Sequence, residues 1–266
     1  MKILSVGDSH GSSVPLSIAK KYLSSVDKIV FEGDYVDSFN SKWETGQEEN
    51  LNNILAFKKE NPDKVVLLWG NHDFSYISDS NVSGHQQFHA MDIGEFFKKN
   101  FDLFDIVFIQ DKWIFSHAGV SQAWLDDEMP SYMRIWENEE FETNLDPIPS
   151  VYQIKDWFTN RPMRFDHRSG DPCGDNKVEG CLWIRPASLL LNGVEGFNQV
   201  VGHTEFEDKL DGRILITADC LSKNALIKTK EKFKNRDEKY VFVDSEKRNC
   251  YAIIDTSTNE VNINLD

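Results

Sequence analysis

Five short runs of the sequence combine small residues with side chains that can bind a metal ion. The runs are residues 7–11 (GDSHG), 33–37 (GDYVD), 70–73 (GNHD), 116–119 (SHAG) and 202–204 (GHT). They supply six candidate ligands, which are Asp8, His10, Asp34, Asn71, His117 and His203. Carboxylate, imidazole and amide donors suit manganese, iron or zinc, and the absence of thiolates from this set argues against a structural zinc site.

This donor set predicts a pair of metal ions that activates water. Asp8 and His10 are two residues apart on one loop, so both can reach one ion, and Asp34 has two oxygens that can bridge two ions. The other three candidates can complete the second position, and Asn71 is also expected to contact the substrate. Two ions about 3.5–4 Å apart can share a hydroxide at neutral pH, which predicts hydrolysis by in-line attack on phosphorus.

Each run follows a short apolar segment that is typical of a β-strand. The expected strands are residues 3–6, 28–31, 65–69, 113–115 and 199–201,. The expected helices are residues 15–26, 48–60 and 92–100, with Asp92 as the cap of the last one,. Strands that alternate with helices indicate an α/β or mixed fold, in which the loops after the strands gather at one edge of the sheet. The six donors are therefore expected to converge.

The remaining sequence and the composition limit the classes of protein to consider. The chain has 266 residues, of which 40% are apolar, and its net charge of −15 argues against non-specific binding to nucleic acid or anionic membranes,. It lacks an apolar run long enough to span a bilayer, so we expect a soluble cytoplasmic protein. Its four cysteines are far apart, as expected of buried or idle thiols,.

The second half of the chain has weaker patterns. Periodicity fades between residues 122 and 180, which we interpret as an elaborated insertion on a single domain of residues 1–266. The charged residues 228–239 are expected to form a solvated excursion, and residues 251–265 a closing antiparallel hairpin,.

The ordered set of five runs resembles the motifs of the calcineurin-like metallophosphoesterases, particularly the phosphoprotein phosphatase branch. That family has GDxHG, GDxVDRG, GNHE or GNHD, a histidine in an HGG-like turn, and GHT, and the resemblance covers residues 7–204. It implies an α/β (α+β mixed) fold of four layers, with two stacked mixed sheets flanked by helices. It also implies a phosphoesterase with two divalent ions, most often Mn²⁺ with iron or zinc as alternatives, and a phosphorylated substrate.

The resemblance also suggests roles around the metal ions. His72 follows the ligand Asn71, so its imidazolium can face the substrate and protonate the leaving oxygen as a general acid,. Asp37 matches the family carboxylate that hydrogen-bonds this histidine. The family arginine is missing, because Ser38 follows Asp37. Arg185, in an LWIRP run similar to the LWxR run of bacterial members, is the expected phosphate contact,.

Several alternatives stay open. Arg161, Arg164 and Arg168 form a second arginine cluster that can contact phosphate or face solvent. The substrate can be a phosphomonoester such as a Ser/Thr phosphoprotein, or instead a dinucleoside polyphosphate, a cyclic nucleotide or an RNA 2′,3′-cyclic end. A non-catalytic scaffold with the same fold is the alternative from another class. The residues expected to have only packing or surface roles are His85, His89, His167, Trp136, Trp157 and Trp183.

Overall fold

The computed structural model describes most of the chain, including all six candidate ligands. The described residues are 1–38, 40–78, 80, 82–128, 151–166, 176–204, 209–210, 214–215, 238–244 and 250–265. The features considered above that lie outside them are Trp136, His167, Arg168, two of the four cysteines (Cys173 and Cys220), residues 129–150 and 167–175 of the expected insertion, and residues 228–237.

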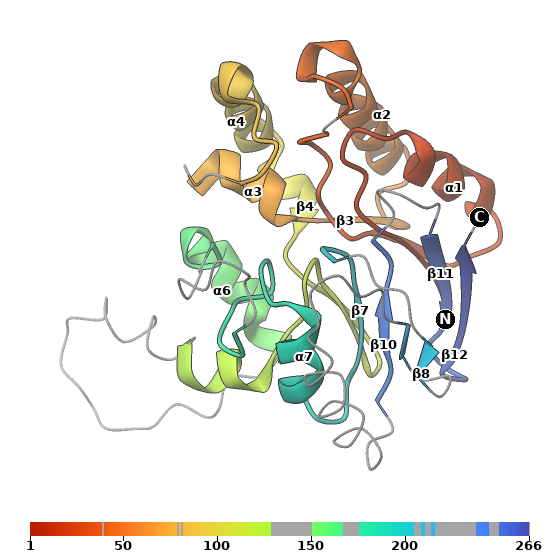
Figure 1. The fold of residues 1–266 in the computed structure, drawn as a ribbon. Coiled ribbons are helices and arrows are strands. Elements are labelled where there is room, and N and C mark those ends of the chain that lie inside the picture. The colour runs from red at the N-terminus through yellow and green to blue at the C-terminus, as the bar shows by residue number, and fades with distance from the viewer. Residues whose placement is uncertain are drawn as a thin grey trace.

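Within the described residues, the first sheet has six strands in the order β12-β11-β1-β2-β3-β4 (Figure 1). These strands are β1 (Lys2–Val6), β2 (Lys28–Phe31), β3 (Val65–Leu68), β4 (Phe104–Asp105), β11 (Cys250–Asp255) and β12 (Glu260–Leu265). Strands β1 to β4 run parallel, and β11 is antiparallel to both β1 and β12. Leu4 of β1 therefore lies opposite Ile29 on one side and Ile253 on the other.

The second sheet, in the same part of the chain, has six strands in the order β5-β6-β7-β10-β9-β8. They are β5 (Phe108–Gln110), β6 (Trp113–Phe115), β7 (Asn198–Val201), β8 (Lys209–Leu210), β9 (Ile214–Leu215) and β10 (Tyr240–Phe242). The four inner strands are parallel, and β5 and β8 close the two edges in antiparallel fashion.

The helices cover the outer faces of the sheets. They are α1 (Val14–Tyr22), α2 (Gln47–Glu60), α3 (Asn71–Ser78), α4 (Ala90–Lys99), α6 (Ile154–Asn160) and α7 (Pro186–Asn192). Glutamates in the first turn of α2 and lysines in its last turn stabilise the helix by interacting favourably with its dipole,. Pro62 lies just beyond the end of α2, where it prevents the helix from continuing,. Short 3₁₀ helices and one π-helical turn lie at Trp43–Thr45, Gln87–His89, Phe101–Leu103, Val151–Gln153, Pro162–Arg164 and Trp124–Glu128.

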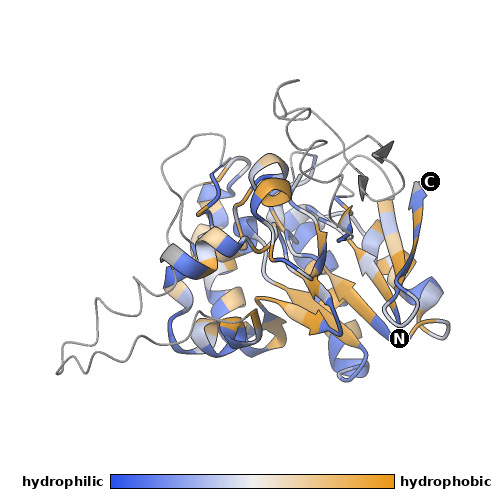
Figure 2. Ribbon diagram, turned by 90° about the horizontal axis from the view of Figure 1, so that it is seen from below, coloured by the Kyte–Doolittle hydropathy of each residue, from blue (hydrophilic) through white to orange (hydrophobic). Residues whose placement is uncertain are grey.

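Alternating side chains on the strands produce a four-layer arrangement. One apolar cluster joins the facing sides of the two sheets and includes Ile3, Val30, Val66, Trp113, Phe115 and Val200. The intervening residues of the first sheet, such as Leu4 and Ile29, pack with residues of α1 and α2 such as Leu16 and Ile54. On the other side of the second sheet, Val201 and Phe242 pack with Leu189 of α7. Many strand residues are accordingly hydrophobic in Figure 2, whereas the strand that ends at the C-terminus also has hydrophilic residues.

These observations confirm the expected class and the five expected strands, each to within one residue. The closing hairpin is also confirmed, and the side chains of Cys181 and Cys250 are buried. The first expected helix is wrong at its end, because it stops at Tyr22 rather than at residue 26. The cap assigned to Asp92 is wrong as well, because α4 begins at Ala90 and its N-cap is His89. Asp92 instead lies in the first turn, where its charge favours the helix dipole.

Helix α3 was not expected from the sequence. It begins at the candidate ligand Asn71, directly after the β3 strand and Gly70. Its polar residues hide a 3.6-residue period, yet six of its eight residues are buried,. Among the described residues, no helix combines the length and apolar character needed to cross a bilayer.

Candidate active site

The six candidate ligands come together where strands of both sheets end. Asp8 and His10 follow β1, Asp34 follows β2, Asn71 follows β3, His117 follows β6 and His203 follows β7. Five of them are buried, and the imidazole of His10 is 10% exposed. Parallel strands place their carboxyl ends at one edge of a sheet, which is why residues nearly two hundred positions apart can meet here.

Main-chain hydrogen bonds join the loops that carry the ligands. The carbonyl oxygen of Asp34 accepts hydrogen bonds from the amides of Ser9 and His10 at 3.0 and 2.8 Å. The Gly202 amide donates to the His117 carbonyl at 2.8 Å, and the His203 amide donates to a carboxylate oxygen of Asp8 at 2.9 Å. The relative positions of the donors are therefore fixed by the backbone.

The imidazoles of His117 and His203 face each other across a small space. The Nε2 atom of His117 lies 3.1 Å from Nδ1 of His203 and 2.7 Å from Oδ1 of Asn71, and that oxygen lies 3.0 Å from the same His203 nitrogen. Oδ2 of Asp34 is 3.4 Å from His117 Nε2. Three side chains and a carboxylate thus direct nitrogen or oxygen atoms at one point.

The outer nitrogens of these rings show that the facing atoms are lone pairs. His117 places Nδ1 2.7 Å from the Glu32 carbonyl, and His203 places Nε2 3.2 Å from the Trp183 carbonyl, so each outer nitrogen carries the proton,. Burial lowers the pKa of His117 to about 3 and lowers that of His203 as well, which keeps both rings neutral,. Lone pairs that face one another without a proton between them are expected of a cation site. Imidazole nitrogens and amide or carboxylate oxygens are ligands that suit a transition metal.

Asp34 occupies the position between the two halves of the site. Its Oδ2 atom lies 3.4 Å from Nε2 of His117, 3.7 Å from Nε2 of His10 and 4.0 Å from Nε2 of His72. Nδ1 of His10 lies 2.8 Å from the Val36 carbonyl, which leaves Nε2 of His10 as its free lone pair,. Two groups of possible ligands share Asp34, one that also has His10 and His72 and one that also has His117 and His203.

The buried carboxylates also need positive charge. Burial raises the pKa of Asp34 to about 8 and that of Asp73 to about 7, and it raises the pKa of Asp8 well above its ordinary value,. Neighbouring acids add to these shifts, Asp244 for Asp8 and Asp73 for Asp34. Divalent cations would reverse this penalty and hold the carboxylates ionised.

The backbone is strained at several of these residues. His10, Asp34, Asp37 and His203 have φ angles of 40°, 52°, 66° and 62°, in the left-handed region that non-glycine residues rarely adopt,. Such strain costs of order 1–3 kcal/mol per residue and persists where the surrounding structure enforces it, typically at functional sites.

His72 and Asp37 form a buried pair next to the candidate metal ligands. Nδ1 of His72 lies 3.0 Å from Oδ2 of Asp37, so the other ring nitrogen points toward Asp34. The His72 amide donates to Oδ1 of Asp34 at 2.9 Å, which orients the carboxylate. The rings of His72 and His10 meet edge to face, with centroids 4.9 Å apart.

Arg185 reaches the same region from the N-terminus of α7. Its Nη1 atom donates to the His203 carbonyl at 3.1 Å and to the Thr204 hydroxyl at 2.9 Å. Its charge contributes to the lowered pKa values of His117 and His203, after burial. Of the other cluster, Arg161 follows the end of α6 and Arg164 ends the 3₁₀ helix at Pro162–Arg164.

The structure adds supporting residues that the sequence reasoning missed. Asp73 accepts hydrogen bonds from the amides of Tyr35 and Gly70 at 2.8 and 3.1 Å, which ties the loop after β2 to the loop after β3. The Glu32 carbonyl orients His117, and Tyr76 contacts Asp37. Asp73 belongs to the GNHD run, so its position in a motif could have indicated a supporting role. The roles of Glu32 and Tyr76 follow only from the three-dimensional contacts.

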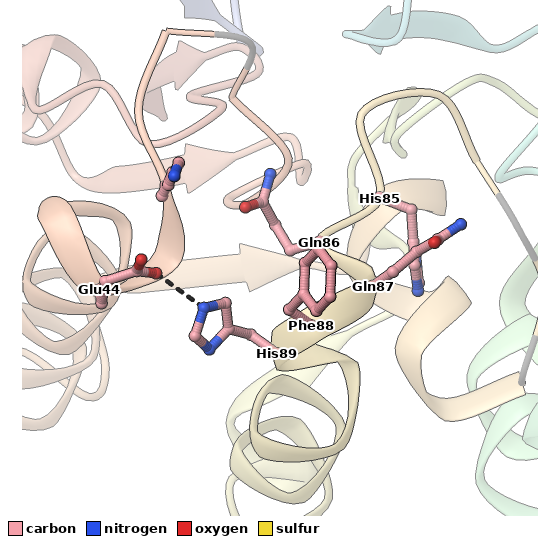
Figure 3. A pocket seen from close by; sticks show the side chains of 7 residues that line it. Glu44, His85, Gln86, Gln87, Phe88 and His89 are labelled. Carbon is pink, nitrogen blue, oxygen red and sulfur yellow. Dashed lines mark ion pairs between the residues drawn. The ribbon is translucent and has the colours of Figure 1, made fainter.

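A pocket of about 430 Å³ lies next to the segment of residues 85–89 (Figure 3). It is lined by Lys42, Glu44 and residues 85–89. Nε2 of His89 lies 2.8 Å from Oε2 of Glu44, and the Phe88 side chain is fully exposed. His85, expected to have an ordinary role, stacks on Tyr76 with ring centroids 4.1 Å apart.

Comparisons with solved structures show the fold. A cold-active protein-tyrosine phosphatase from a psychrophilic Shewanella species matches 99% of this chain and 77% of its own, with a TM-score of 0.53 and 15% identity. A protein serine/threonine phosphatase from Saccharomyces cerevisiae matches 100% of this chain and 79% of its own, with a TM-score of 0.51 and 13% identity. A putative diadenosine tetraphosphatase, with 13% identity over 99% of this chain and 93% of its own, has a TM-score of only 0.44.

Comparisons of sequence give the family. A search of curated proteins finds no relative of this chain. The family model described as calcineurin-like phosphoesterase matches residues 1–204, which include every candidate ligand described above. The chain therefore belongs to the calcineurin-like phosphoesterase family, as the order of its five motifs predicted, and is a metal-dependent phosphoester hydrolase.

Proposed function

We propose that this protein hydrolyses phosphomonoesters at a centre of two divalent metal ions, and that these ions are manganese. The observation that carries the proposal is the convergence of lone pairs from Asn71, His117 and His203 on one side of Asp34, with His10 on its other side. When bound, such ions supply a hydroxide nucleophile at neutral pH and offset the charge of the phosphate oxygens.

The residues of the chain have distinct roles in this proposal. Asp8 and His10 hold one ion, Asn71, His117 and His203 hold the other, and Asp34 bridges them. His72 donates a proton to the leaving oxygen, and Asp37 keeps its ring oriented and favours its charged form. Arg185 binds the phosphate, to which Asn71 also contributes, because a guanidinium can pair with two phosphate oxygens.

Among phosphomonoesters, we propose a phosphorylated serine or threonine side chain as the substrate. The yeast serine/threonine phosphatase named above supports this choice, and the protein-tyrosine phosphatase supports a phosphorylated protein in general. A panel of a phosphopeptide, a dinucleoside polyphosphate and a cyclic nucleotide tests the choice directly. The cytoplasmic location expected from the sequence stays a prediction.

The test of the reaction is phosphate release from p-nitrophenyl phosphate. Manganese-loaded protein is expected to turn over this substrate, and Asp34→Asn is expected to abolish both turnover and retention of the metal. Asp102→Asn, a change at an exposed aspartate, is the matched control and should keep both. Loaded protein that shows no turnover on any member of the panel would favour the scaffold instead.

A further inference from the structure

Asp37 is a fully buried carboxylate whose two oxygens have different partners. Oδ2 lies 3.0 Å from Nδ1 of His72. Oδ1 accepts a hydrogen bond from the hydroxyl of Tyr76. A buried charged oxygen without a donor is costly, so the Tyr76 hydroxyl satisfies the half of the carboxylate that His72 does not reach.

The direction of this hydrogen bond follows from a second contact of the hydroxyl. The main-chain amide of Gln86 donates to the Tyr76 oxygen at 2.7 Å. A main-chain N–H can only donate, so the Tyr76 oxygen is the acceptor in this contact. The hydroxyl proton is therefore available for another acceptor, which is the Asp37 carboxylate,. Burial, followed by the charge of Asp37, raises the pKa of Tyr76, so the hydroxyl stays protonated,.

Tyr76 is itself held firmly. It lies four residues after His72 in α3, so the two side chains project from the same face of the helix,. The ring of His85 stacks on it at a centroid distance of 4.1 Å and an interplanar angle of 14°. His85 and Gln86 also line the pocket of Figure 3, so one segment forms the pocket wall and fixes the tyrosine.

We propose that Tyr76 is a positioning residue that acts through Asp37 on His72, so that the imidazole faces the leaving oxygen. This inference rests on the proposed function, in which His72 protonates that oxygen. The competing explanation is that the ring of Tyr76, a buried residue, only fills space. Tyr76→Phe separates the two, because it keeps the ring and its stacking but removes the hydroxyl.

Two substrates reveal whether proton donation is affected. A p-nitrophenolate ion leaves readily without a proton, whereas the alkoxide of a phosphoserine peptide needs one. In manganese-loaded enzyme, Tyr76→Phe is expected to lower kcat on the phosphoserine peptide about 10- to 100-fold, the usual effect of removing a supporting partner, while KM is kept. The value of kcat on p-nitrophenyl phosphate should change much less. Equal losses on both substrates, or no loss on either, would overturn the inference.

A double-mutant cycle tests whether Tyr76 works through Asp37. Asp37→Asn should itself shift the ratio of the two activities, and Tyr76→Phe added to it should have no further effect on that ratio. The neutral amide also removes the buried charge, so the double variant stays testable even if Tyr76→Phe alone is unstable. If Tyr76→Phe shifts the ratio in the Asp37→Asn background as much as it does in the wild-type enzyme, the inference is contradicted. If Asp37→Asn leaves the ratio unchanged, the proposed acid role of His72 fails instead.

A readout that needs neither turnover nor metal completes the test. In chelator-treated protein with ¹⁵N-labelled histidine, the Nδ1 proton of His72 should give a downfield NMR signal that is lost in His72→Asn. Tyr76→Phe should move this signal and speed its exchange with water. Tyr22→Phe, which removes a hydroxyl paired with Tyr251 away from the site, should leave it in place. A signal unaffected by Tyr76→Phe would contradict the inference.

Discussion

Asp34 illustrates how neighbours determine what a single residue can do. One carboxylate oxygen is fixed by the His72 amide, and the other lies within 4.0 Å of the Nε2 atoms of His10, His72 and His117. Burial raises its pKa to about 8, so at neutral pH the charge on Asp34 depends on positive partners. Under our proposal, Asp34 would contact both cations, which would account for all of these features.

Arg185 gives a prediction at the same scale. Arg185→Gln is expected to raise KM for a phosphomonoester about 10- to 100-fold, which corresponds to the loss of charge-assisted hydrogen bonds worth about 1.5–3 kcal/mol. Arg185→Lys should recover only part of this loss, because an ammonium cannot pair with two oxygens at once. Steady-state kinetics on p-nitrophenyl phosphate check both. A larger KM increase from Arg161→Gln would place the phosphate contact in the other arginine cluster.

Where a motif contained a residue, the sequence predicted its place in the fold. The six donors each follow a strand, and strand ends are readable from short apolar runs. Tyr76 could not be found in this way, because its role depends on its position within a helix that the pattern did not reveal. The contacts of the Glu32 and Trp183 carbonyls with His117 and His203 could not be predicted either. Every residue has a main-chain carbonyl, so the residue type does not indicate which carbonyl makes such a contact.

At the scale of elements, the close approach of the loops after β2 and β3 explains why Gly70 is needed. A Cβ atom at Gly70 would lie 2.1 Å from Oδ1 of Asp34 and 2.2 Å from its amide nitrogen. Gly70→Ala is therefore expected to displace Asp34 and to weaken metal binding about 10- to 100-fold, the range seen when support of a ligand is lost.

Isothermal titration with manganese checks this expectation. Gly180→Ala is the matched control, because a Cβ there meets its nearest atoms at 3.4 Å, an ordinary contact. Unchanged affinity in Gly70→Ala would show that the loop after β2 can move without loss of the site. Equal weakening in both variants would point to a general effect of alanine on folding.

Elements differed in how far they could be predicted. Strands buried on both faces form continuous apolar runs and were readable, as in β1 and β3,. Strand β4 has two residues and gives too short a pattern, and α3 lacks a clear period because its first residues belong to the site. Tertiary contacts, rather than local preference, decide these two elements.

At the scale of the whole molecule, the core includes residues from the segment expected to be an insertion. Val151, Ile154 and Phe158 share one apolar cluster with Leu4 and Phe31 of the first sheet. This packing supports our proposal that the chain folds as one domain. It also explains why residues 151–158 carried a weak pattern, since they add to the core that the first sheet forms,.

The buried acids predict how stability depends on pH without metal. Asp34 and Asp73 have folded pKa values of about 8 and about 7 against an ordinary value of 3.8, so above pH 6.5 the folded chain keeps protons that the unfolded chain has lost. The free energy of unfolding should therefore fall from pH 6.5 to pH 8, by about 1.4 kcal/mol per pH unit for each proton retained. Below pH 6.5, protonation of His117 and His203 in the unfolded chain opposes this trend.

Urea unfolding of chelator-treated protein at pH 6.5, 7.25 and 8 measures this slope. Metal-loaded protein is the control and should lack the decline, because bound cations keep the same carboxylates ionised in the folded state. A chelated protein that becomes more stable over this interval would contradict the raised pKa values.

The most direct test of the two-metal centre is a crystal structure of manganese-loaded protein with anomalous data collected at the manganese edge. We expect two anomalous peaks about 3.5–4 Å apart, one on each side of the Asp34 carboxylate. One peak should lie beside His10, and the other between Asn71, His117 and His203. A fully loaded crystal with no peak between these side chains, or with only one, would contradict the account.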